Sequence, residues 1–405
     1  MDDRPAPADP RGGRADIGGA LAAAATDLAV RLVSLDTVNP GLVPGAPGEG
    51  AAVELLRDRL AAAGWSTAVV LPADGAPDRP SLLAWTPEPR PVTVLLNGHL
   101  DTVGVEGMGA PFAARIDGDR LLGRGACDMK GGVAALVAAG EALAAGPGAP
   151  RVVLALVADE EDRSLGTEAV LEALPGLGLH PDVALVAEPT GLDICTSHRG
   201  YAVVEIELHG RAAHSSQPEL GVNTAHLAAR LVAQVEAAGR VLADSGGSLM
   251  VTVVEAGRAP FTVPPHARVV VERRTVPGER AGDALAEVES LLVGLRAAAP
   301  EATATATLTH AREAWRLDDH GPAAHLARAL REQLVAQGAE PATLDAPYWM
   351  ESPLWQDAGI PTVVCGPGGG GLHAVDEWLD LAQLRRFVGA LPAALRTAAE
   401  DLGGH

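Results

Sequence analysis

Lysine, cysteine and aromatic residues are scarce in this chain of 405 residues. Three cysteines, Cys127, Cys195 and Cys365, lie far apart, which excludes a cysteine-based metal site and a disulfide framework. A reducing cytoplasm is therefore the predicted compartment. Lys130 is the only lysine among 31 basic residues. Either arginine does not fit at this position, or Lys130 has remained by chance in a sequence with a strong codon bias toward arginine.

Positive charge is also in short supply. The 52 acidic residues outnumber the basic ones and give a net charge of -21, which excludes nucleic acid and anionic membranes as partners. The first 19 residues are rich in Asp, Arg, Pro and Gly and contain no apolar core. They predict a disordered lead-in over 1–19, and they resemble neither a signal peptide nor a membrane anchor.

The length and the apolar content predict two domains, or one large domain that carries an insertion. Apolar residues recur at helical spacing over 17–35 and 49–63, and apolar strands are expected at 66–71, 81–85 and 92–96. Strands that are apolar on both faces belong in the middle of a sheet that helices cover. The sequence thus predicts an α/β catalytic domain whose first part spans 20–197.

The pattern changes over 198–311. Alternating strands and two helices follow one another there in the order β-α-β-β-α-β, which predicts a split βαβ sandwich inserted into the larger fold. The pattern of apolar strands and covering helices returns over 312–405, the second part of the catalytic domain. A helix is expected at 320–337, a strand at 361–365 and a final helix at 381–402.

Several charged or metal-ligating residues are expected at strand ends or on the loops beside them. Open α/β folds build their sites at the carboxyl ends of strands. Alone, Asp128 could be a helix N-cap, and the acidic run 159–162 could be a surface turn. Together these residues form a nitrogen and oxygen ligand set suited to zinc, with cobalt or manganese as alternatives. The set consists of His99, Asp128, Glu160, Glu161, Glu188 and His373.

Two neighbours of these ligands have predicted supporting tasks. Asp101 lies two residues beyond His99, where it can accept the second imidazole N–H and fix the tautomer. Glu160 and Glu161 should point in different directions, so that one coordinates metal and the other takes a proton from water.

Four motifs together resemble the dinuclear zinc amidohydrolases that include acetylornithine deacetylase, succinyl-diaminopimelate desuccinylase, aminoacylase and carboxypeptidase G. The motifs are Gly98-His99-Leu100-Asp101, the run 123–132, Asp159-Glu160-Glu161 and Glu188-Pro189-Thr190. The resemblance covers the chain from about residue 20 onward. It implies a zinc-peptidase-like catalytic domain, with a central mixed sheet flanked by helices, and an inserted ferredoxin-like lid and dimerisation domain.

The resemblance also implies a role for each site residue. His99 and Glu188 would hold one zinc ion, Glu161 and His373 would hold the other, and Asp128 would bridge them. Glu160 would be the general base.

The inserted domain would form a homodimer and supply His214 to stabilise the oxyanion, often across the dimer; without the resemblance, His214 could equally be a solvated loop histidine. Arg274 resembles the lid arginine that pairs with a substrate carboxylate, although a surface arginine beside a turn would look the same. Phe261 stands near the place where relatives usually carry Asn. Asn223, Glu351 and Gly371 complete the predicted substrate contacts.

The expected activity is hydrolysis of an amide bond in an N-acyl amino acid or a similar small carboxylate, with two zinc ions per chain. A dipeptidase or carboxypeptidase of the same fold is the main alternative. A binding protein that has lost its chemistry is a more remote one, since a competent residue fills every metal and acid–base position.

Overall fold

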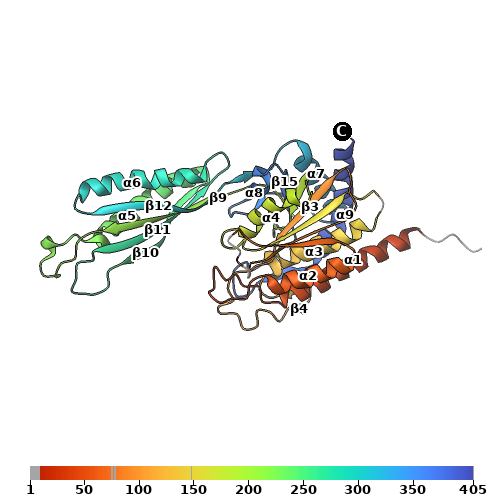
Figure 1. Cartoon of the computed structure of the whole chain (residues 1–405), viewed down its shortest axis with the longest axis horizontal. Helices are drawn as coiled ribbons and strands as arrows, with labels where there is room; N and C mark the ends of the chain where they lie inside the picture. Colours follow the sequence, from red (N-terminus) through yellow and green to blue (C-terminus); the bar gives the residue numbers. More distant parts are fainter. Residues whose placement is uncertain (1–9, 74–75, 77–78, 147, 405) are drawn as a thin grey trace, which may run out of the picture. The chain divides into compact units, whose positions relative to one another are not determined.

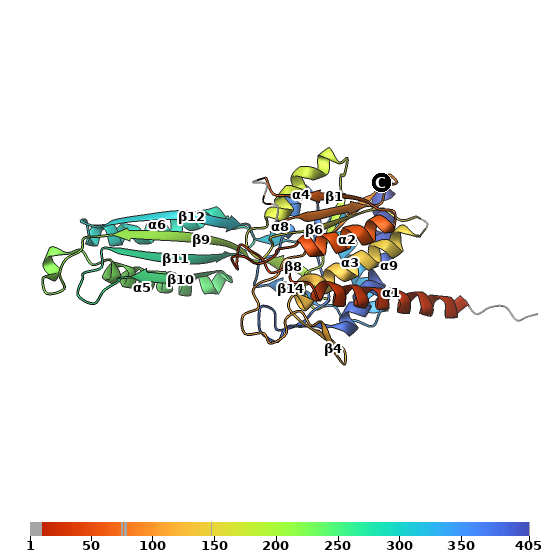
Figure 2. The same cartoon turned by 60° about the horizontal axis from the view of Figure 1, so that its bottom comes forward.

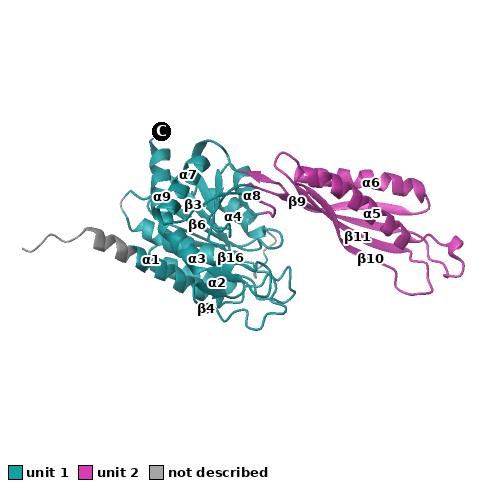
Figure 3. Ribbon diagram, turned by 180° about the vertical axis from the view of Figure 1, so that it is seen from behind, with its two compact units in different colours: residues 1–196, 317–344, 350–405 teal, residues 197–316, 345–349 magenta. Residues whose placement is uncertain are grey.

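The computed structural model describes residues 10–73, 76, 79–146 and 148–404. The chain divides into two compact units (Figure 3). The first unit comprises Met1–Thr196, Leu317–Leu344 and Met350–His405, and the second comprises Ser197–Arg316 with Asp345–Trp349. The short segment Asp345–Trp349 thus groups with the second unit, although it lies within the range predicted for the last part of the catalytic domain.

A nine-stranded mixed sheet, most of which belongs to the first unit, has the order β1-β2-β6-β3-β7-β15-β8-β13, with β14 paired to β8. Its strands are β1 (Ser66–Val70), β2 (Ser81–Trp85), β3 (Thr93–His99), β6 (Arg151–Val157), β7 (Val183–Val186), β8 (Ile194–His198), β13 (Trp315–Arg316), β14 (Thr343–Ala346) and β15 (Thr362–Val364). β13 and the last residues of β8 and β14 fall within the ranges of the second unit. The boundary between the units falls within β8. This architecture confirms the predicted α/β class.

The middle strands β6, β3, β7 and β15 run parallel, and β3 is buried along its whole length. Parallel strands need both faces covered, which explains their nearly continuous Val, Leu and Ala content. β1 corrects one prediction. It is the edge strand of the sheet, and its side chains are only half-buried or exposed, because one side of the strand has no partner.

Helices cover both faces of this sheet (Figures 1 and 2). On one face lie α1, α2, α3 and α9, while α4 and α8 pack together on the other. The helices of this unit are α1 (Pro10–Val33), α2 (Gly50–Ala62), α3 (Gly131–Ala144), α4 (Leu165–Gly176), α7 (Gly321–Ala336), α8 (Ser352–Asp357) and α9 (Leu381–Gly403).

The first helix begins earlier than the sequence predicted. α1 starts at Pro10, so the part of the expected lead-in from 10 to 19 is helical, and residues 1–9 lie outside the described residues. Proline at the first helical position loses no hydrogen bond, and its fixed φ suits a helix, which favours this start.

A small antiparallel sheet in the order β16-β17-β5-β4 joins two loops that are far apart in the sequence. It consists of β4 (Arg115–Asp117), β5 (Arg120–Leu122), β16 (Gly369–Gly370) and β17 (Trp378–Asp380). Trp378 pairs with Leu122, so the loop after β5 and the loop around His373 are held side by side. Both loops carry predicted metal ligands.

The second unit is a four-stranded antiparallel sheet in the order β10-β11-β9-β12, with α5 and α6 on one face (Figure 1). Its elements are β9 (Gly200–His209), α5 (Thr224–Leu242), β10 (Ser248–Ala256), β11 (His266–Thr275), α6 (Ala284–Ala298) and β12 (Thr303–Arg312), with 3₁₀ turns at Pro218–Leu220, Ala243–Ser245 and Ala281–Asp283. Alternate residues of β9 are buried under the helices. This arrangement confirms the predicted ferredoxin-like insertion.

Among the described residues, no helix has both the length and the apolar character needed to cross a bilayer.

Candidate metal centre

Four residues of the predicted ligand set lie at or just after the ends of neighbouring parallel strands of the first unit. His99 is the last residue of β3, level with Val157 at the end of β6. Glu160 and Glu161 follow β6, and Glu188 follows β7, which pairs with the other side of β3. Because parallel strands end at the same edge, these side chains converge on one region.

Asp128 is positioned by a buried carboxylate that sequence reasoning missed. It lies in the turn Ala126–Lys130 directly before α3, where its own backbone is extended rather than helical (φ -116°, ψ 95°). The carboxylate of Glu377 accepts hydrogen bonds from the backbone amides of Gly125, Cys127 and Asp128 at 2.9 to 3.1 Å. It also pairs with Arg124 at 2.7 Å. Glu377 thereby fixes the loop that presents Asp128.

The two carboxylate oxygens of Asp128 face different histidines. Oδ1 lies 3.0 Å from Nε2 of His99, and Oδ2 lies 3.4 Å from Nε2 of His373. Beyond Asp128, His373 Nε2 is 3.1 Å from Glu161, and His99 Nε2 is 3.9 Å from Glu188 and 4.0 Å from Glu160. The site thus has two halves that share Asp128, which is the geometry of a bridging carboxylate.

The charges of the cluster shift the ionisation of its members. Burial opposes protonation of His99, but the carboxylates of Asp101 and Asp128 outweigh it and hold its pKa well above the ordinary value. Contacts with Asp128 and Glu161 raise the pKa of His373 to about 10. Burial and neighbouring acids raise the pKa of Glu188 as well. Each shift indicates a site short of positive charge.

The donor set fits divalent metal ions. Two imidazoles and several carboxylates suit zinc, and each half offers one histidine with acidic oxygens at its side. Oε1 of Glu188 is buried and has no hydrogen-bond partner within the part of the chain that the structure describes. Such an atom is costly to bury, and a bound cation would satisfy it. Ligand atoms lie within 4.8 Å of one another in the groups His99–Asp128–Glu161 and His99–Glu160–Glu188, which share His99. His373 belongs to neither group and joins the cluster through its contacts with Asp128 and Glu161.

Asp101 supports the acidic loop more directly than the imidazole. His99 Nδ1 lies 3.1 Å from the backbone oxygen of Asp101 and 3.5 Å from its carboxylate. The carboxylate accepts hydrogen bonds from the amides of Glu160 and Glu161 at 3.1 and 3.2 Å. The imidazole therefore contacts both the main chain and the carboxylate of Asp101, and the same carboxylate positions both glutamates.

A buried polar network lies behind Asp101, and the sequence pattern did not reveal it. Asn39 donates to Asp101 at 2.8 Å and to Asp159 at 3.0 Å. Arg79 pairs with Asp159 at 2.7 Å and with Glu49 at 2.9 Å. All of these side chains are buried. The network neutralises Asp159 at the bend of the acidic loop, where Asp159 has a φ of +69°.

Lys130, the single lysine, is fully buried and donates to the backbone oxygen of Leu35 at 2.9 Å. Burial lowers the pKa of its amino group to about 7. The slender amino group fits a site beside Gly125, where a larger guanidinium would need more space.

Two of the predicted substrate residues lie in the first unit. Glu351 is buried, and burial raises the pKa of its carboxyl to about 7, with His99 and Asp101 among the charges that influence it. Gly371 has a φ of +68°, and a Cβ there would approach the backbone oxygen of Asp376 to 2.8 Å. Gly371 thus permits the turn before His373.

The other predicted substrate residues lie in the second unit. Asn223 caps α5, since its side-chain oxygen accepts from the amides of Ala225 and His226. The guanidinium of Arg274 pairs with Glu272 and lies 5.5 Å from the ring centre of Tyr201.

The remaining two, Phe261 and His214, belong to a pair of hydrogen-bonded loops. Phe261 is 71% exposed, and His214 is also exposed. The amide of Ser216 donates to Nδ1 of His214 at 3.2 Å.

Comparison with known proteins places the chain in a family. The model of peptidase family M20/M25/M40 matches residues 95–397. The chain belongs to this family of hydrolases. The match confirms the resemblance drawn from the motifs.

Relatives and solved structures agree with this assignment. N-acetyl-L-citrulline deacetylase of Xanthomonas campestris pv. campestris is 32% identical over 88% of this chain and 93% of the relative. Succinyl-diaminopimelate desuccinylase of Dinoroseobacter shibae is 31% identical over 86% of this chain and 94% of the relative. A tripeptidase of Staphylococcus aureus shares the fold, with a TM-score of 0.77 and 16% identity over 94% of this chain and 99% of that one.

Proposed function

We propose that this M20 hydrolase cleaves the amide bond of an N-acyl amino acid or a similar small carboxylate, and that it uses two zinc ions per chain. Cobalt or manganese could substitute for zinc. The observation that carries the proposal is Asp128, whose two oxygens each face one histidine, with a further carboxylate beside each histidine. The proposed ligands are His99, Asp128, Glu161, Glu188 and His373.

When bound, the two metal ions would polarise the scissile carbonyl and lower the pKa of a water molecule. Asp128 would contribute to both sites. His99 and Glu188 would hold one ion, and Glu161 and His373 the other. The amides fixed by Asp101 keep the two neighbouring glutamates directed to different halves of the cluster.

Glu160 is the proposed general base. Its carboxylate lies at the edge of the cluster, 4.0 Å from His99, and the ligand set described above is complete without it. In the reaction Glu160 takes a proton from the attacking water as the oxygen bonds to the carbonyl carbon. It then delivers the proton to the amine nitrogen as the C–N bond breaks.

We further propose that the second unit forms a homodimer and supplies substrate contacts. The Ser216 amide donates to Nδ1 of His214, and the Ser216 hydroxyl lies 2.8 Å from the same nitrogen. Both contacts suit a neutral ring that carries its proton on Nε2. That N–H can donate to the oxyanion, from the same chain or from the partner. Arg274 offers a planar donor for a substrate carboxylate once it leaves Glu272, and Phe261 supplies an exposed aromatic surface.

The decisive experiment replaces Glu160 with Gln. Turnover should fall by about 10² to 10⁴-fold, the usual size of a general acid–base contribution, while the metal content stays near that of the parent protein. Steady-state kinetics and metal analysis of the same preparations would measure both.

Asp162→Asn is the matched control, because Asp162 lies in the same acidic run but pairs only with the neighbouring Arg163 among the ion pairs described. It should retain the parent's turnover. Full activity in Glu160→Gln, with the metal content unchanged, would show that Glu160 is not the base.

Substrate class requires a panel of N-acetyl, N-succinyl and N-carbamoyl amino acids together with dipeptides. The names of the two relatives favour acyl amino acids. Cleavage of dipeptides alone would exclude the deacylase proposal and leave a dipeptidase or carboxypeptidase. Cleavage of nothing, with the metal bound, would favour a binding protein. A cytoplasmic location is proposed with this function, since all three cysteines are free and buried.

A further inference from the structure

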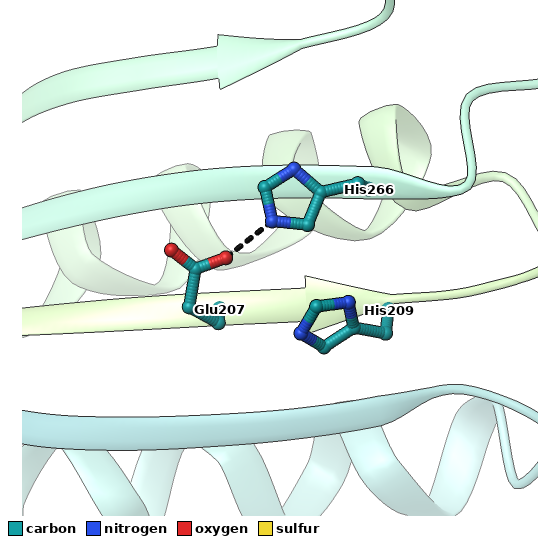
Figure 4. A group of neighbouring side chains, drawn as sticks. All are labelled: Glu207, His209 and His266. Atoms are coloured by element: carbon teal, nitrogen blue, oxygen red, sulfur yellow. Dashed lines mark hydrogen bonds and ion pairs between the residues drawn. The ribbon is translucent and has the colours of Figure 1, made fainter.

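A second cluster of metal-ligating side chains lies in the ferredoxin-like unit, on its own sheet (Figure 4). Glu207 and His209 are on β9, and His266 begins β11. The two strands are antiparallel neighbours, and the register pairs His266 with His209. One ligand atom from each of the three residues lies within 4.8 Å of the others. We refer to these three residues as the sheet cluster.

The alternation of the strands explains why the three side chains share one face. Leu208 and Ala267, the neighbours of His209 and His266 in sequence, are fully buried beneath the helices. Residues on either side of them must therefore point to the opposite, open face of the sheet. Solvent reaches this face, since the side chain of His266 is 45% exposed and that of Glu207 is 31% exposed.

The three side chains are arranged around a common point. Nε2 of His266 contacts a carboxylate oxygen of Glu207 directly (Figure 4). The rings of His266 and His209 are tilted by 43°, with their centres 5.0 Å apart. Two imidazoles and one carboxylate match the three protein ligands of an open zinc site, in which water takes the fourth position.

Nearby charges leave the carboxylate of Glu207 available to a cation. Arg268 lies opposite Glu207, but its guanidinium pairs with Glu205 and approaches Glu255 to 3.8 Å. On the other side, β12 places Thr305 opposite Glu207 and Thr303 opposite His209. Both are uncharged. The cluster therefore has acid and imidazole ligands with no dedicated cation of its own among the described residues.

We propose that Glu207, His209 and His266 bind one zinc-type transition-metal ion, in a site separate from the cluster around Asp128. The remaining position is open to water. His266 also lines a hollow of about 530 Å³ together with residues of the loop after β10, which leaves space beside the site. The proposal does not depend on the activity of the hydrolase.

The position of this site gives it a mechanical consequence. Directly beyond the two histidines, the segment 210–216 and the loop 257–265 are joined by backbone hydrogen bonds. Gly210 donates to Pro265 at 2.7 Å, Val263 donates to Ala213 at 2.9 Å, and Ser215 donates to Phe261 at 3.0 Å. A metal ion that links His209 to His266 would restrain the two segments where they leave the sheet, next to these histidines.

The test measures zinc bound by the full-length protein after equilibrium dialysis against micromolar free Zn²⁺. Relative to the parent, His209→Ala and His266→Ala should each lose one equivalent, or bind it at least about tenfold more weakly. His310→Ala is the matched control, because His310 is an exposed histidine on β12 of the same sheet, outside the cluster. It should retain the parent's zinc content.

Because each variant is compared with the parent, the occupancy of the Asp128 cluster does not affect the result. Unchanged zinc content in both His209→Ala and His266→Ala, or an equal loss in His310→Ala, would refute the site. Circular dichroism in the absence of zinc would verify that the variants fold.

Hydrogen exchange tests the mechanical consequence. Zinc should slow exchange of the Val263 and Ser215 amides by at least about tenfold in the parent but not in His209→Ala. Equal exchange rates with and without zinc in the parent would overturn the restraining role.

Discussion

Two clusters of histidine and acid occupy this molecule, and they differ in how they are built. The cluster around Asp128 is largely buried, with His373 as its exposed member, and its residues lie at the ends of different strands or on the loops that follow them. Asp101 and Glu377 fix those loops through backbone amides. The sheet cluster depends on the register of two strands, and its residues lie on an open face, where the side chain of His266 is 45% exposed and that of Glu207 is 31% exposed.

The difference shows how buried groups that do not themselves bind metal position a set of ligands. Ligands on separate loops converge only if other buried groups fix each loop, whereas ligands on paired strands are placed by the ladder itself. The first construction allows several acids to be buried together, as catalysis requires. The second produces a simpler and more accessible site that can exchange its metal readily.

Chelation should produce the largest effect and should separate the two clusters. A strong chelator should abolish activity and lower the free energy of unfolding by about 3 kcal/mol for each site that was saturated a hundredfold above its Kd. A weak chelator should empty the sheet cluster first, with activity retained. Activity and zinc content followed along a chelator series would test this order. Simultaneous loss of all zinc and all activity would contradict it.

Glu377→Gln should have the next largest effect. It leaves Arg124 buried without its anionic partner and weakens three bonds to backbone amides, so we expect a loss of about 3 kcal/mol in unfolding free energy. Urea denaturation would measure the loss, and zinc affinity should fall as well. Glu54→Gln, an exposed acid on α2, should change neither quantity. A stable Glu377→Gln protein with normal zinc affinity would show that the loop presenting Asp128 does not need the carboxylate of Glu377.

Asp101→Asn should lower zinc affinity or turnover by about 10 to 100-fold, since Asn keeps the shape but replaces one acceptor oxygen with a donor. That nitrogen would face an amide of Glu160 or Glu161, or the side-chain amide of Asn39. Competition with a zinc indicator would give the affinity. Asp117→Asn, in an exposed turn, serves as the control. Identical affinities for the parent and Asp101→Asn would remove Asp101 from the supporting groups.

A second buried histidine, His198, extends the comparison to pH. Burial lowers the pKa of His198 to about 4, in contrast to His373, whose acid partners raise it. In the unfolded chain, His198 becomes protonated below its ordinary pKa of 6.5. In the folded chain it stays neutral until about pH 4. Stability should therefore fall as the pH decreases through this window, by about 3 kcal/mol in total from this residue.

His198→Asn removes this titration while its side-chain amide can still donate to the backbone oxygen of Arg199. Urea denaturation at several pH values should show a shallower acid loss in the variant than in the parent. Parallel curves would show that His198 is not responsible.

The sequence revealed most of the fold, together with the cluster of ligands, because both depend on local patterns. Apolar strands that end in a histidine or an acid are visible without a structure, and so is the β-α-β-β-α-β order. The supporting groups were not visible. Asn39, Arg79 and Glu377 lie in irregular segments, and their partners are far away in the chain. No periodicity marks such residues.

Asn223 teaches a related lesson. Its position directly before α5 was a typical N-cap signal, and the structure shows it in that role. The sheet cluster, in contrast, required the register of two strands that are separated by a whole helix and a further strand. Glu207 and His209 alternate on one strand, but nothing local connects them with His266.

The interrupted first unit also has a consequence for synthesis on the ribosome. His99, Asp128, Glu161 and Glu188 are all translated before the second unit, and His373 only after it. The nascent chain must therefore carry an incomplete, strongly acidic half-site while the whole insertion is made. A metal ion captured early would lack the last proposed imidazole ligand, so the proposed centre would be completed only at the end of translation.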